Sequence, residues 1–76
     1  MAQVGRVKWF QNAKGIGFIT AHGVDYFVHY SSIVTKGFKS LKDGQMVEFV
    51  PLKTDRGMSA TEVRPVSLDI ADDFPQ

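Results

Sequence analysis

The hydrophobic residues of this chain fall in short runs of five to nine residues, and polar residues, glycines and prolines separate the runs. The runs are rich in β-branched and aromatic residues, which is the composition of β-strands. No stretch has the 3.6-residue period of an amphipathic helix over a useful length. We therefore predict five strands, at residues 4–10, 16–20, 25–30, 45–53 and 58–64.

The segments between these runs predict how the strands connect. Residues 11–15, 21–24 and 54–57 are typical of turns, and residues 31–44 predict a short helical turn near 31–34 followed by a long loop. Pro51 cannot donate a ladder hydrogen bond, so we expect it near a strand end, at an edge or at a bulge. Five short strands within about 60 residues favour a small closed barrel, because closure removes exposed sheet edges.

Strand alternation divides the central residues between two faces. Ile19 and Val28 are natural core residues, and Tyr26 shares the inward face of Val28. The opposite face then carries Phe18 and Phe27, together with their neighbours Ile16, Asp25 and His29. Exposed rings are uncommon on a soluble protein unless they bind something. The opposing interpretation is a barrel core rich in Phe.

Composition narrows the classes of function. The chain has 76 residues and no cysteine, so it holds one small domain without disulfides or thiolate zinc sites. It has no signal peptide and no apolar stretch of the length that spans a bilayer, so we expect a cytoplasmic protein without a membrane partner. Residues 1–66 carry nine Lys and Arg against five Asp and Glu, a formal +4, whereas residues 67–76 hold three Asp and no base. A basic body favours a polyanionic partner.

Aromatic rings among cations suit single-stranded nucleic acid. Its bases expose flat π-faces, and stacking a base on a ring contributes about 1–3 kcal/mol. Gly15 and Gly17 flank the stacking positions and allow a bulge or a close backbone approach. Neighbouring Lys and Arg attract phosphates. The candidate binding residues are Lys8, Trp9, Lys14, Phe18, Phe27, His29, Tyr30, Phe38 and Arg56.

Several sequence strings, in this order and spacing, resemble the bacterial cold shock proteins and the cold shock domain. They are VKWF at 7–10, KGIGFI at 14–19, YFVHY at 26–30, GFKSL at 37–41 and GQMVEF at 44–49. The resemblance implies an all-β, five-stranded antiparallel barrel of the oligonucleotide-binding (OB) fold. It also implies binding of single-stranded RNA and DNA, with a preference for pyrimidine-rich stretches, and roles in RNA chaperoning and in regulating transcription or translation.

The resemblance also assigns residues. Phe18, Phe27, His29 and Tyr30 match stacking positions, and Lys14 matches the basic residue of the first motif. Ile16 stands where that motif has Phe, so one stacking platform is weakened. Gln11 stands where Asn is usual, which affects one hydrogen bond to a base. The remaining matches to binding positions are Lys8, Trp9, Asp25 and Phe38.

Two other functions remain open from the sequence. A barrel of this size could bind Pro-rich peptides in an aromatic groove, although the cations Lys8, Lys14 and Arg56 disfavour that. A Ser–His–Asp arrangement with His29 and Asp25 has nothing to support it, so we expect no enzymatic activity, no cofactor and no metal site. We expect a monomer with a cold shock domain at 1–66. The acidic tail at 67–76 is either flexible or a mimic of nucleic acid in the groove.

Overall fold

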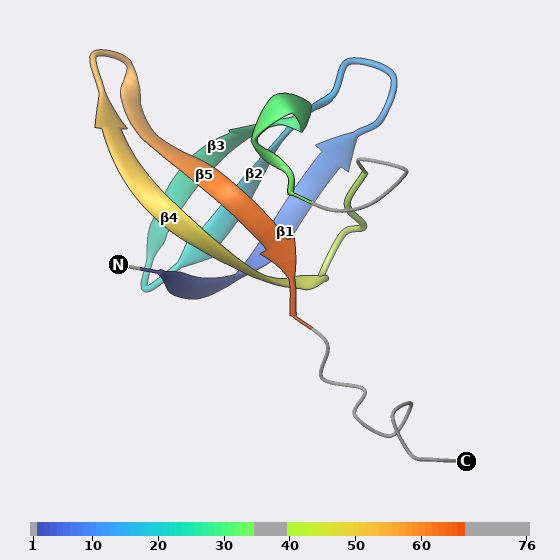
Figure 1. Cartoon of the computed structure of the whole chain (residues 1–76), viewed down its shortest axis with the longest axis horizontal. Coiled ribbons are helices and arrows are strands. Elements are labelled where there is room, and N and C mark those ends of the chain that lie inside the picture. The colour runs from blue at the N-terminus through green and yellow to red at the C-terminus, as the bar shows by residue number, and fades with distance from the viewer. Residues whose placement is uncertain (1, 35–39, 67–76) are drawn as a thin grey trace.

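The computed structural model describes residues 2–34 and 40–66 as a five-stranded barrel (Figure 1). The strands close in the order β1-β2-β3-β5-β4. A short 3-10 helix, η1, follows β3, and the β4–β5 hairpin curves away from the rest of the barrel (Figure 1). The elements are β1 (Gln3–Gln11), β2 (Ile16–Ala21), β3 (Val24–His29), η1 (Tyr30–Ser32), β4 (Met46–Thr54) and β5 (Gly57–Pro65).

The predicted all-β barrel is confirmed, with one pair of strands in a different orientation. β1–β2, β2–β3, β1–β4 and β4–β5 pair antiparallel, whereas β3 and β5 pair parallel. The reason is geometric, because strand direction cannot alternate all the way around a closed ring of five. The parallel pairing of β3 with β5 is a single register pair, Phe27 with Ser59.

The core is built by the inward faces of all five strands. Ile19 and Val28 are fully buried, as the alternation predicted, and Tyr26 points inward with its ring centroid 4.8 Å from that of Phe49. No polar or charged residue is buried in the described ranges. The buried hydrophobic residues are Val7, Ile19, Ala21, Tyr26, Val28, Ile33, Leu41, Val47, Phe49, Ala60 and Val63.

Pro51 lies in the part of β4 that has only one neighbouring strand. β1 pairs with β4 through Met46–Phe49 only, so the residues of β4 after Phe49 have β5 as their one neighbouring strand. A register shift between Glu48 and Val50 precedes the proline. Pro51, which has no N–H to donate, therefore lies in a part of β4 that is a sheet edge, as expected.

Gln3 places a polar atom in this otherwise apolar interior. Its Oε1 atom is buried and has no hydrogen-bond partner in the described part of the chain. A buried acceptor without a partner costs about 1–3 kcal/mol. We therefore expect Gln3→Leu to raise the free energy of unfolding by about 1 kcal/mol in urea titrations. Val4→Leu, at the exposed neighbouring position, is the control, and an equal gain in both variants would contradict this explanation.

Candidate functional site

A β-bulge in β1 sets the geometry of the site. The register between β1 and β2 shifts between Val7 and Trp9, so Lys8 is an extra residue in the ladder. Val7 is buried, whereas Lys8 and Trp9 both point outward, and Phe10 turns back to pack against the core. Strict alternation would have separated Lys8 from Trp9. The bulge instead presents a cation and a large ring on one surface.

Three aromatic residues form a row across the outer face of the barrel, which we call the aromatic row: Trp9, Phe18 and Phe27. Trp9 faces Phe18 in the β1–β2 register, and Phe18 faces Phe27 in the β2–β3 register. Ring centroids are 5.6 Å apart for Trp9–Phe18 and 5.7 Å for Phe18–Phe27, both edge to face. Trp9 is 36% exposed and both Phe side chains are half-buried. The rings thus support one another and still present surface to solvent.

A second row lies beside the first, toward the end of the barrel that carries η1. Ile16 faces His29 across β2 and β3, and Gln11 faces Ile16 across β1 and β2. The His29 ring stacks on Tyr30, with centroids 4.6 Å apart and planes 28° apart. The side chain of Ile16 has no π-face, so this row has rings only at its β3 end.

Two glycines make this close packing possible. A Cβ on Gly17 would contact the Trp9 carbonyl oxygen and would lie 2.8 Å from Phe10 Cδ1. A Cβ on Gly15 would contact the Tyr30 ring, and Gly15 also has a φ of +69°. The close backbone approach that the sequence predicted is therefore present at Gly17, whereas at Gly15 the close neighbour is the side chain of Tyr30.

Charged groups border the aromatic row. Lys8 Nζ lies 3.0 Å from Asp25 Oδ2, and both side chains are about half exposed (50% and 47%). An exposed pair of this kind contributes little to stability. It does hold the Asp25 carboxylate, an acceptor for N–H groups, beside the rings. Lys14 is exposed in the β1–β2 turn.

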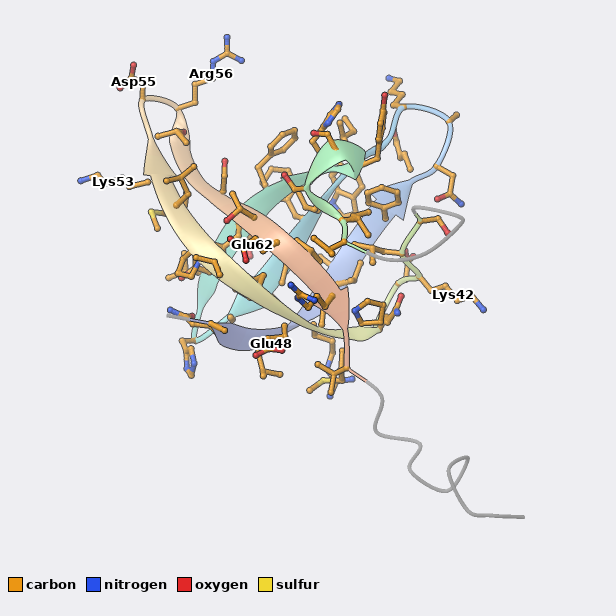
Figure 2. All side chains as sticks on the ribbon, in the orientation of Figure 1. Lys42, Glu48, Lys53, Asp55, Arg56 and Glu62 are labelled. Atoms are coloured by element: carbon orange, nitrogen blue, oxygen red, sulfur yellow. The ribbon has the colours of Figure 1, made fainter. Side chains whose placement is uncertain are left out.

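A hollow of about 500 Å³ opens where the aromatic row reaches the β4–β5 hairpin. Figure 2 shows Arg56 at the tip of that hairpin, beside Asp55. The apolar walls and charged rim of the hollow suit a flat, partly polar ligand. The lining residues are Phe18, Asp25, Phe27, Thr54, Arg56, Gly57, Met58 and Ser59.

The structure brings together most of the residues that the sequence predicted. Trp9, Phe18 and Phe27 form one surface with Lys8, Asp25 and Arg56 at its border, and His29 and Tyr30 lie in the adjacent row. Lys14 lies in the turn beyond that row, and Phe38 lies outside the described residues. Sequence reasoning missed four residues that line the hollow: Thr54, Gly57, Met58 and Ser59. Local patterns gave no signal for them, since they join the hollow through the placement of the β4–β5 hairpin beside β2 and β3, which is a long-range feature.

The described residues contain no cluster of three or more His, Cys, Asp or Glu side chains that could hold a metal ion. Among the same residues, no helix has the length and apolar character needed to cross a membrane.

Residues 3–66 match the model of the 'Cold-shock' DNA-binding domain. The chain belongs to this family. The resemblance inferred from the sequence strings is thereby confirmed, and with it nucleic-acid binding as the general function. The matched range covers all five strands of the barrel.

Curated cold shock proteins resemble the chain over most of its length. It is 52% identical over 67 residues to the cold shock-like protein CspD of Haemophilus influenzae, covering 86% of this chain and 93% of that protein. It is 54% identical over 65 residues to the major cold shock protein CspA of Pseudomonas aeruginosa, covering 84% of this chain and 94% of that protein.

A solved structure supports the fold independently of sequence. The barrel superposes on the Drosophila Unr CSD456 structure with a TM-score of 0.71 at 15% identity. The match covers 87% of this chain and 27% of the other, so the chain spans about a quarter of that structure. At 15% identity this similarity shows a shared barrel fold and nothing further.

Proposed function

We propose that this protein binds single-stranded RNA and DNA on its outer face, with a preference for pyrimidine-rich stretches, and acts as an RNA chaperone. The observation that carries the proposal is the aromatic row, three rings side by side with cations at the border. Successive unstacked bases can stack on such a row without regard to their hydrogen-bonding edges. A chaperone needs this tolerance, because it must bind many sequences.

The geometry favours single strands over duplexes. In a duplex each base is stacked on both sides, so its π-face is out of reach of a ring on a barrel surface. A single strand can turn its bases toward the rings and leave its phosphates at the border. There, Lys8, Lys14 and Arg56 can contact phosphates, and Asp25 can accept an N–H from a base edge. Tyr30, 48% exposed, and His29 extend the surface toward η1.

The same arrangement favours binding over catalysis and a monomer over an oligomer. The aromatic row and its charged border come from one chain, so the site is complete in one copy. His29 hydrogen-bonds Ser31 rather than Asp25, whose carboxylate pairs with Lys8, so these groups do not form a nucleophilic triad. We infer a non-enzymatic monomer that acts in the cytoplasm, among its nucleic-acid partners.

Fluorescence of Trp9, the single tryptophan of the chain, tests the proposal directly. Titration with a thymidine heptamer should quench Trp9 saturably, because a base stacks on its ring. Raising salt should weaken binding with a log–log slope of about −2 if Lys8, Lys14 and Arg56 each contact a phosphate. A proline-rich peptide that binds this surface while the heptamer does not would refute the proposal.

Ile16→Phe should strengthen binding of the thymidine heptamer. Ile16 lies opposite His29 on the binding face, and a ring there supplies a platform that an aliphatic chain lacks. Stacking on one further ring contributes about 1 kcal/mol or more, so affinity should rise at least about fivefold. Ile16→Leu, which adds no ring, is the control. An equal gain in both variants would show that bulk rather than a π-face is responsible.

A further inference from the structure

His29 has a fixed arrangement of its two ring nitrogens. Nδ1 lies 3.2 Å from the backbone nitrogen of Ser31 and 2.8 Å from Ser31 Oγ, and His29 thereby caps η1. A backbone N–H can only donate. Nδ1 must therefore be an unprotonated acceptor, and the neutral imidazole carries its proton on Nε2.

The proton on Nε2 has no hydrogen-bond acceptor among the residues that the structure describes. No hydrogen bond joins Nε2 to another described residue, and Nε2 is not a buried unpaired atom. The half-buried ring is held in place by the stack on Tyr30 and by Ile16 across the β2–β3 register. Tyr30 covers one face of the ring, and among the described residues no other aromatic ring stacks on the second face and no acceptor bonds Nε2, so both can meet a ligand.

We propose that His29 recognises the bound strand as a hydrogen-bond donor, through Nε2–H to an acceptor oxygen of the nucleic acid, in addition to any stacking. The backbone N–H of Ser31 positions that donor by occupying Nδ1. The proposal rests on the function proposed above and adds to it one specific hydrogen bond between the protein and the bound strand. Ile16, which lies opposite His29, offers no π-face for stacking. A directed hydrogen bond from His29 would therefore select the group that binds there, either a base carbonyl or a phosphate oxygen.

The tautomer can be read without any ligand. Long-range ¹H–¹⁵N spectra of the free, full-length protein above pH 7.5 should show an unprotonated Nδ1 and a protonated Nε2 for His29. His22, exposed in the β2–β3 turn, serves as the internal reference for an imidazole whose tautomer is not fixed. A proton on His29 Nδ1 would overturn the proposal.

The donor itself is tested by an isosteric ring. In a synthetic 76-residue chain, β-(4-thiazolyl)alanine at position 29 keeps a ring nitrogen at the Nδ1 position and replaces Nε2–H with sulfur. Loss of one neutral hydrogen bond should weaken binding of the thymidine heptamer about five- to tenfold, with the thermal midpoint unchanged. Affinity within twofold of the natural chain would refute the donor role.

A second probe distinguishes the acceptors. A heptamer of 5-methyl-2-pyrimidinone lacks the O4 oxygen of thymine. A penalty from the thiazole ring that disappears with this probe assigns the acceptor to O4, and an equal penalty assigns it to O2 or a phosphate oxygen; both support the donor. If the natural chain binds neither heptamer, the function proposed above fails, and the ¹⁵N spectrum still reports separately whether Nε2 holds the proton.

Discussion

Replacing Phe18 with alanine is expected to weaken binding of a thymidine heptamer by about ten- to a hundredfold. Phe18 is the middle ring of the aromatic row and contacts both others edge to face. Its removal takes away one stacking platform, which is worth about 1–3 kcal/mol. It also removes the support that fixes the orientation of Trp9 and Phe27, so this position should exceed either neighbour in effect. Trp9 fluorescence titration measures the loss.

Two variants keep this prediction specific. Phe18→Tyr retains a ring and should bind within about threefold of the natural chain. Val4→Ala truncates another exposed side chain, 47% exposed and opposite Glu48 in β4, and should leave affinity unchanged. A Phe18→Ala protein that folds normally and binds as tightly as the Val4→Ala protein would exclude the aromatic row as the binding surface.

Replacing Gly17 with valine is expected to lower the free energy of unfolding by about 3 kcal/mol. The Cβ would contact the Trp9 carbonyl oxygen and lie 2.9 Å from Phe10 Cα, both backbone atoms that cannot rotate away. Relief requires moving β1 from β2 at the bulge. In a domain of this size such a loss is a large share of the total stability.

Urea titration followed by circular dichroism measures this effect. Thr20→Val is the matched control, since it places the same side chain in the same strand on the outward face, where Thr20 is half-buried. It should stay within about 0.5 kcal/mol of the natural chain. Equal unfolding midpoints for the two variants would contradict the close approach of β1 and β2. Heptamer binding by the residual folded Gly17→Val protein should also weaken, because Trp9 belongs to the displaced segment.

The sequence was sufficient to predict β2 and β3, and the reason is physical. In both strands an apolar inward set alternates with an aromatic outward set, so one parity assigns Ile19 and Val28 to the core and Phe18 and Phe27 to the surface. The structure has the same assignment, and the register between the strands brings the two rings together.

Alternation could not predict β1. The run Val7–Lys8–Trp9–Phe10 fits a regular strand with Lys8 and Trp9 on opposite faces, and the extra residue of a bulge changes no residue type. Both residues were nevertheless predicted to bind, as the cation and ring of the strand beside Phe18, and the resemblance to cold shock proteins assigns them the same role. The bulge itself was not predicted. Long-range geometry could not be predicted either, since Met58 lines the hollow together with Phe18 and Phe27 of other strands. The roles assigned to Phe38 and to the tail at 67–76 remain predictions.

The parallel contact between β3 and β5 has a consequence for how the molecule moves. Six residue pairs join β2 to β3, whereas Phe27 with Ser59 is the register pair that joins β3 to β5. Separating β3 from β5 breaks fewer backbone pairings than separating any other two neighbouring strands, so among the strand pairs amide exchange should be fastest here. A strand of nucleic acid that spans Phe27 and the hollow beyond it would lie across the seam and hold it shut. Ligand binding would then slow amide exchange in β3 and β5 and raise the melting temperature. The surface that binds RNA would thereby also stabilise the pairing of β3 with β5, which has the fewest register pairs in the barrel.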